Sequence, residues 1–110
     1  MVYVSVTGLR VKSIWRVPLF WRHALPAMIQ ARRAPGNLLA DARRIDGVQH
    51  TLSVWRRRDD MRAYIASGAH LKAMKDFRRI ATGSTCGWEA DGVPTWDEAI
   101  AYWRANGRAY

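Results

Sequence analysis

An alternation of apolar and polar residues from Val48 to Trp55, directly after Asp46-Gly47, constrains the fold of this chain more than any other feature. A period of two residues is typical of a strand with one buried face. Asp-Gly favours the two-residue turn that joins antiparallel strands, so the weaker run Asn37 to Asp46 is expected to be the preceding strand. The fold must therefore contain an antiparallel hairpin. One face of its second strand carries Val48, His50, Leu52 and Val54.

The first third of the chain predicts a strand followed by a helix. Valines alternate with polar residues from Val2, and this strand is expected to reach about Lys12. A helical stretch with Pro18 near its start follows, and Pro35-Gly36 is expected to end it. Pro26 lies inside this stretch, which predicts a kink or a break. The apolar face of the helix, at helical spacing, consists of Phe20, Ala24, Ala27 and Ala31.

The middle of the chain predicts a helix in two segments. Asp59 and Asp60 open it, since acidic residues are favourable at a helix N-terminus. Ser67-Gly68 interrupts it. The inward positions are expected to be Met61, Tyr64 and Ile65 before the interruption and Leu71, Met74 and Phe77 after it.

The last third predicts a strand and a final helix. The strand runs from Gly83 to Ala90 and places Ser84, Cys86 and Trp88 on one face. Thr95 and Glu98 have the spacing of a capping box, which marks a helix start. The apolar stripe of that helix is Trp96, Ile100 and Trp103, and Gly107 is expected to end it.

These elements predict one α+β domain over residues 1–110, in the ferredoxin-like order β-α-β-β-α-β with an added C-terminal helix. Helices would cover one face of the sheet. The other face would be apolar and exposed unless a further layer covered it. A second copy of the same sheet is the simplest cover, so a homodimer is expected.

Composition narrows the class of protein. The net charge is +9, but the arginines form short groups spread along the chain, which favours a solvated surface over nucleic-acid binding. An anionic small ligand is the other reading of this charge. The single cysteine, Cys86, excludes an internal disulfide, and a buried inert thiol is its expected state. No membrane span or signal peptide is visible, so the cytoplasm is the expected location.

Several short motifs resemble one family. They are Ala34-Pro35-Gly36, the strand Gly47 to Trp55, Met61-Arg62-Ala63-Tyr64, Ser67-Gly68-Ala69-His70, Ala73-Met74 and Gly92-Val93-Pro94-Thr95. Together, over roughly residues 34–100, they resemble the antibiotic-biosynthesis-monooxygenase-like group of dimeric α+β barrels, and especially its small spheroidene-monooxygenase-like relatives. The resemblance implies a dimeric α+β barrel. Its members include cofactor-independent oxygenases, haem-binding and haem-degrading proteins and isomerases, so fold alone does not choose the chemistry.

His70 is the main candidate for a catalytic base or a cofactor ligand. It shares a helix face with Met74 and Phe77 and is expected to point inward. An imidazole in an apolar pocket can ligate haem iron or accept a proton. Some haem-binding members of the resembling group use a histidine in this region. The alternative is a structural histidine bonded to a backbone carbonyl.

Other residues are candidates for pocket walls: Trp21, His23, Trp55, Tyr64, Met74 and Trp88. For Trp55 and Tyr64 a core position is the favoured alternative, and His50 would lie near a dimer interface if its side of the sheet were the barrel interior. The histidines and Cys86 are scattered without metal-ligand spacing, so no metal site is expected.

Two functions remain open at this stage. The first is a monooxygenase-like or haem-dependent protein acting on a small apolar molecule, neutral or anionic, between sheet and helices. Its cofactor would be haem or none, and arginines near the pocket mouth would hold any carboxylate. The alternative is a non-catalytic dimeric module that binds a ligand or a partner, because the chain offers no unmistakable catalytic constellation.

Overall fold

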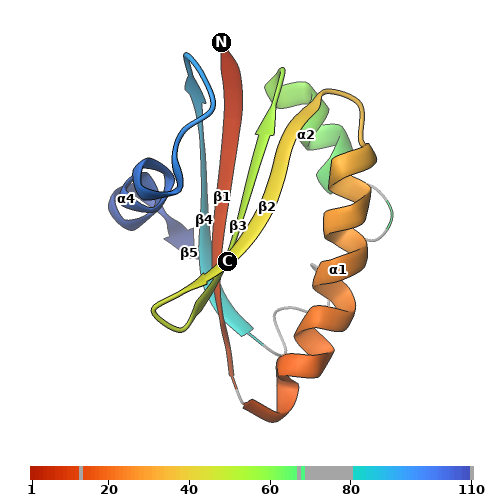
Figure 1. Ribbon diagram of the computed structural model, residues 1–110, viewed down its shortest axis with the longest axis vertical. Helices are drawn as coiled ribbons and strands as arrows, with labels where there is room; N and C mark the ends of the chain where they lie inside the picture. Colours follow the sequence, from red (N-terminus) through yellow and green to blue (C-terminus); the bar gives the residue numbers. More distant parts are fainter. Residues whose placement is uncertain (13, 67, 69–80, 110) are drawn as a thin grey trace.

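The computed structural model describes residues 1–12, 14–66, 68 and 81–109. Figure 1 shows three layers, with helices α1 and α2 on one side of a sheet and helix α4 on the other. The α+β class and the ferredoxin-like order with an added C-terminal helix are confirmed. The predicted segment with Leu71, Met74 and Phe77 lies outside the described residues.

The central strand of the sheet is β1 (Val2–Val11), which pairs antiparallel with β3 (Val48–Trp55) and with β4 (Ala81–Ala90). Strand β2 (Asn37–Ile45) lies outside β3, and the short β5 (Arg108–Ala109), which was not predicted, lies outside β4. The order is β2-β3-β1-β4-β5. Successive side chains of a strand point to opposite faces. Thus one face of β1 carries Val2, Val4 and Val6, and the other carries Tyr3, Ser5 and Thr7.

The β2–β3 hairpin turns where the sequence predicts it. Asp46 and Gly47 both adopt positive φ, at 52° and 77°. Two consecutive positive φ angles define the type I′ turn, which Asp-Gly favours because both residues tolerate this conformation. The turn fixes the register in which Ile45 faces Val48.

Helix α1 (Val17–Arg33) follows a short 3-10 turn, η1 (Ile14–Arg16), and continues through Pro26. Of the kink or break expected at Pro26, the break is therefore not formed. Pro26 and Arg22 are both exposed, so water can bond to the Arg22 carbonyl that the proline leaves without a donor. The predicted inner face is confirmed: Phe20, Ala27 and Ala31 are buried. Helix α2 (Arg58–Ile65) has Asp59 and Asp60 in its first turn, as predicted.

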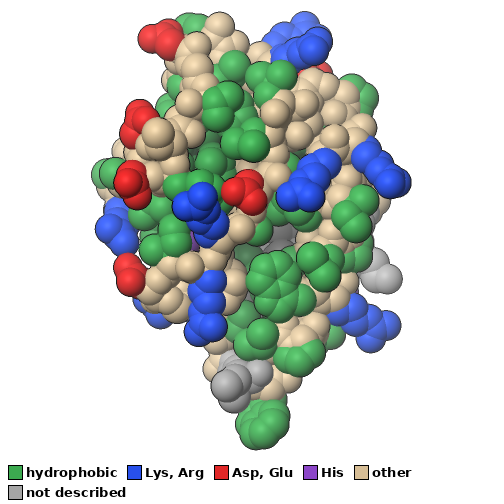
Figure 2. Space-filling view, viewed as in Figure 1, with side chains coloured by type: hydrophobic (Ala, Val, Ile, Leu, Met, Phe, Trp, Pro, Cys, Tyr) green, Lys and Arg blue, Asp and Glu red, His purple; other side chains and the backbone are tan. Residues whose placement is uncertain are grey.

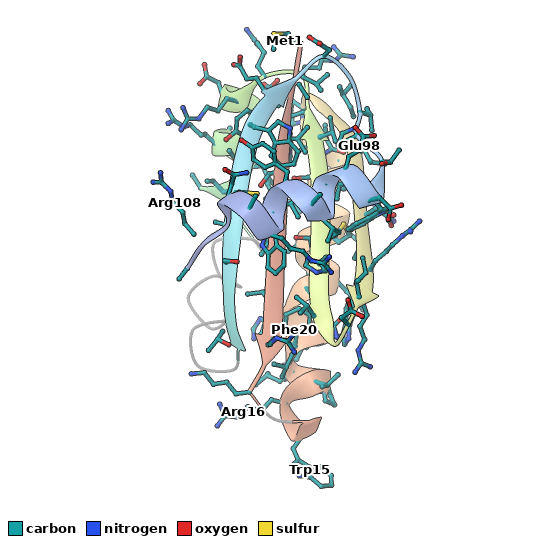
Figure 3. The ribbon with its side chains drawn as sticks, turned by 90° about the vertical axis from the view of Figure 1, so that its left-hand side faces the viewer. Met1, Trp15, Arg16, Phe20, Glu98 and Arg108 are labelled. Carbon is teal, nitrogen blue, oxygen red and sulfur yellow. The ribbon has the colours of Figure 1, made fainter. Side chains whose placement is uncertain are left out.

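Helix α4 (Trp96–Asn106) begins with the predicted capping box of Thr95 and Glu98. Figure 3 shows it lying across the sheet, on the face opposite α1 and α2. It packs Ala99 against the fully buried Val4, Val6, Leu52 and Val54. Two indole N–H groups anchor it, since Trp96 donates to Asp41 and Trp103 donates to the Ser84 carbonyl, both at 3.0 Å.

The position of α4 corrects one expectation. The second face of the sheet was expected to need another copy as its cover, but α4 of the same chain covers it. His50 accordingly lies beneath α4, only 2% exposed, with its ring 4.6 Å from that of Trp103. Burial lowers the pKa of His50, so this histidine is held neutral.

The absence of a side chain at Gly8 leaves room for the rings of His50 and Trp103. A substitution of Gly8 should therefore destabilise the fold. A Cβ at Gly8 would overlap the Trp103 ring and lie 2.9 Å from Cε1 of His50. Gly8→Ala is expected to lower the free energy of unfolding by about 1–3 kcal/mol, the usual range for overpacking. Urea denaturation checks this. Gly92→Ala is the control, because a Cβ there meets nothing within 4 Å, and equal losses for both variants would contradict the packing argument.

Across the described residues, we find no helix with the length and hydropathy needed to cross a membrane.

Candidate functional site

A cavity of about 90 Å³ lies between the sheet and helices α1 and α2. We call it the sheet–helix cavity. Figure 2 shows apolar side chains gathered in the region between β2 and α1, with basic side chains around them. The lining residues come from three sources: Ser5, Thr7, Leu9, Ala40, Thr51, Leu52 and Ser53 from the sheet, Phe20, Ala24, Ala27, Met28 and Ala31 from α1, and Met61, Tyr64 and Ile65 from α2.

Small side chains on α1 create the space. Ala24, Ala27 and Ala31 face the sheet where larger residues would fill the gap, and Phe20, only 2% exposed, packs with Leu9. The volume is below the roughly 150 Å³ of a cavity that takes up benzene. A ring-sized ligand therefore requires Met28 and Met61 to move, and methionine side chains adapt readily.

The sheet contributes hydroxyl groups to the cavity. Ser5 faces Ser53 across β1 and β3, and Thr7 faces Thr51 one pair further along. Thr7 also faces Thr85 of β4, and their Oγ atoms are 3.1 Å apart. The cavity thus has a polar floor and an apolar wall. No charged side chain belongs to the lining within the described part of the chain.

Tyr64 joins the two helices at one side of the cavity. Its hydroxyl donates to the Ala27 carbonyl at 2.8 Å, and its ring stacks on Trp55 with centroids 5.2 Å apart. Burial raises the pKa of Tyr64 above its ordinary value of 10.0. Tyr64 therefore serves as a neutral wall and as a tie between α1 and α2.

The raised pKa of Tyr64 predicts a loss of stability in alkali. Above about pH 10 the unfolded chain loses this phenolic proton while the folded chain keeps it, so the free energy of unfolding falls as pH rises. Denaturation curves between pH 8 and pH 12 are expected to show a steeper decline for the wild type than for Tyr64→Phe. Identical slopes in the wild type and in Tyr64→Phe would contradict the assignment.

The structure places the predicted wall residues in different regions. Tyr64 lines the cavity, and Trp55 lies directly behind it, fully buried. Trp21 packs edge-on against Phe20 but lines a separate open hollow with Val17 and Pro18. His23 is half-buried and is not part of the lining.

Trp88 lies on the opposite face of the sheet, stacked on Tyr102 of α4 at 3.8 Å, so it does not reach this cavity. Cys86 shares that face and is partly buried rather than fully buried as expected; this burial raises the pKa of its thiol to about 11. His70 and Met74 lie outside the described residues.

The hydroxyls of Ser5, Thr51 and Ser53 were not proposed as site residues. A signal for them was present, because they are the polar positions of two alternating strands. Only the strand register, which pairs Ser5 with Ser53 and Thr7 with Thr51, shows that they meet.

The described residues do not fit haem. The cavity of about 90 Å³ is well below the roughly 300–1,000 Å³ of ordinary ligand pockets. The described lining offers no imidazole or thiolate as an axial ligand. Nor do the described residues contain a group of three or more histidine, cysteine or acidic side chains that could hold a metal ion.

Comparisons with known proteins identify the fold. No protein-family model matches the sequence, and no curated protein matches it significantly. Solved structures do match. SnoaB, a cofactor-independent oxygenase from Streptomyces nogalater, aligns with a TM-score of 0.68 and 19% identity over 84% of this chain and 95% of that one.

Two further solved structures also align with this chain. A proposed antibiotic biosynthesis monooxygenase from Nitrosomonas europaea has a TM-score of 0.72 and 18% identity, covering 84% of this chain and 90% of that one. Rv0793 from Mycobacterium tuberculosis has a TM-score of 0.73 and 11% identity, covering 84% of this chain and 99% of that one. The chain therefore has the α+β fold of the antibiotic-biosynthesis-monooxygenase-like proteins, as its sequence motifs imply.

Proposed function

We propose that this protein is a monooxygenase-like enzyme that oxidises a small, largely apolar molecule in the sheet–helix cavity. The observation that supports this most directly is the cavity itself, a partly enclosed space with an apolar wall and a few polar groups. Such a space is the usual form of a small-molecule site. SnoaB, which shares this fold, is a cofactor-independent oxygenase, and this likeness is the reason to test oxygen chemistry first.

The described residues would contribute binding, orientation and exclusion of water. The alanines and Phe20 of α1 hold the apolar part of a substrate against the sheet. Removing water strengthens the remaining polar interactions and protects a reactive carbanion or radical. In a reaction without a cofactor, the substrate itself supplies the electrons: a CH₂ group and O₂ become a carbonyl group and water.

Proton removal needs a base. Within the described lining there is no carboxylate or imidazole, and Tyr64 keeps its proton in its bond to Ala27. We propose His70 as the base on the strength of the sequence pattern. His70→Ala should then lower kcat while leaving the binding of a substrate analogue unchanged; an unchanged kcat would remove His70 from the mechanism.

Oxygen uptake tests the proposal. Purified protein is mixed in an oxygen electrode with small neutral molecules that carry an activated CH₂ group, phenylacetone and 2-indanone. The expected result is uptake of one O₂ per ketone formed, with one labelled atom in the product from ¹⁸O₂. Saturable binding of these molecules without oxygen uptake would favour the alternative, a non-catalytic ligand-binding module.

The homodimer expected from the sequence is a separate proposal. Because α4 covers Val4, Val6 and Leu52, a second copy would have to use another surface or displace α4. Exposed apolar side chains on α1, Leu25 at 55% and Ile29 at 51%, offer such a surface. Light scattering decides the matter: twice the chain mass of 12.6 kDa supports the dimer, and the single mass rejects it.

A further inference from the structure

Five hydroxyl groups form two rows across the sheet, on the face that α1 and α2 cover. One row is Ser53–Ser5, and the other is Thr51–Thr7–Thr85. Four of the five line the sheet–helix cavity, and Thr85 lies beside them. We call this set the hydroxyl floor. It is the polar part of a lining that is otherwise apolar.

The hydrogen bonds of the floor divide it into two parts. Thr85 Oγ donates to the Val6 carbonyl at 3.2 Å, so its single proton is used there. In the 3.1 Å contact between Thr7 and Thr85, the proton must then come from Thr7. Thr7 and Thr85 are thus both used in hydrogen bonds within the protein.

The other three hydroxyl groups of the floor differ from those of Thr7 and Thr85 in their hydrogen bonding. Ser5, Thr51 and Ser53 are half-buried, and their side chains form no hydrogen bond with another described residue. Polar groups removed from bulk water normally have a partner. These three can both donate and accept, and they face a cavity. They are available to a hydrogen-bonding group of a bound molecule.

Charge restricts that molecule. Within the described part of the chain no lining residue is charged, and the described basic groups lie elsewhere: Arg32, for example, bonds through Nε to the Ala40 carbonyl at 3.1 Å. Burying an ionised group without an opposite charge is strongly unfavourable. Among the described residues, the positive charge of the protein thus does not extend to the cavity lining.

We propose that the hydroxyl floor determines specificity, selecting uncharged ligands that carry a hydroxyl or N–H group on one edge and an apolar surface opposite. This inference rests on the proposed function, because it concerns the same cavity. The polar edge lies against β1 and β3, and the apolar part lies against α1. Ser53 and Thr51 are the specificity-determining residues that can be changed without disturbing the Thr7–Thr85 contact.

Three matched probes test the inference by ¹⁹F NMR on the intact chain: 4-fluorophenol, 4-fluorotoluene and 4-fluorobenzoate. They have one ring each and differ in the group that would meet the floor. The expected result is binding of the phenol at least tenfold tighter than the toluene, with no saturable binding of the benzoate. Toluene binding as tight as phenol binding, or preferential benzoate binding, would overturn the inference.

Variants locate the effect. Ser53→Ala and Thr51→Val should each weaken phenol binding at least threefold and leave toluene binding unchanged. Thr82→Val is the matched control, on an exposed position of β4 outside the cavity, and should change neither. If either cavity variant fails to fold, Ser5→Ala replaces it. Phenol binding that survives all three cavity substitutions would overturn the assignment.

The two proposals fail in different ways. Selective phenol binding without oxygen uptake from any substrate would reject the oxygenase and keep the hydroxyl floor as the recognition element of a binding module. Oxygen uptake that is indifferent to Ser53→Ala and Thr51→Val would keep the oxygenase and reject the floor. If the wild type binds none of the three probes and takes up no oxygen, both proposals are rejected.

Discussion

Trp55→Ala is expected to lower the free energy of unfolding by about 3–5 kcal/mol, the range found when large aromatic residues are removed from a core. Trp55 has no exposed surface, stacks on Tyr64 and lies in a cluster with Ala31 and Ala40. Its loss would leave a void beneath the cavity wall. Because a domain of this size has only about 5–15 kcal/mol of total stability, much of the variant could be unfolded near 37 °C.

Thermal and urea denaturation measure this effect, and the chain offers a matched control. Trp15→Ala makes the same substitution at a side chain that is 89% exposed, so little change is expected. Trp55→Phe adds a second comparison: Trp55 Nε1 has no hydrogen-bond partner in the described structure, so losing this N–H leaves no broken bond. A loss for Trp55→Ala no larger than for Trp15→Ala would show that Trp55 is not a core residue.

Ala24→Leu is expected to abolish ligand binding and turnover, by 100-fold or more, with a small effect on stability. Ala24 lines the cavity from α1 and is half-buried, so three extra carbon atoms would occupy the ligand space rather than displace the sheet. Overpacking at a fully buried site would cost about 1–3 kcal/mol, and a smaller cost is expected here.

Binding of 4-fluorophenol and oxygen uptake measure the effect of Ala24→Leu. Ala101→Leu, on the exposed side of α4, makes the same change on a helix outside the cavity and should bind and turn over like the wild type. Full activity in Ala24→Leu would place the reaction somewhere other than the sheet–helix cavity.

Local patterns in this sequence predict local structure well. The alternation in β3, the Asp46-Gly47 turn and the capping box at Thr95 each depend on neighbouring residues, and each is found where predicted. The inner face of α1 follows for the same reason, because helical spacing alone places Phe20 and Ala27 on one side.

Properties that depend on how distant elements meet were harder to predict. Alternation on β4 groups Trp88 with Cys86 but does not show which face meets α1; Trp88 lies on the face that α4 covers, where it lines a separate hollow with Pro94 and Tyr102. The side of the sheet that α4 covers is likewise a matter of tertiary packing. The hydroxyl floor depends on a strand register that pairs residues more than forty positions apart in sequence.

The position of β1 has a consequence for the order in which parts of the molecule open. Its backbone is bonded to β3 on one edge and β4 on the other, and helices cover both faces. Amides of Val4 and Val6 should therefore be the last to exchange with deuterium, at rates set by global unfolding, whereas β5 and the outer edge of β2 should exchange early. Since the cavity lies on the helix side of this strand, a displacement of α1 or α2 would widen it while the centre of the sheet stays closed.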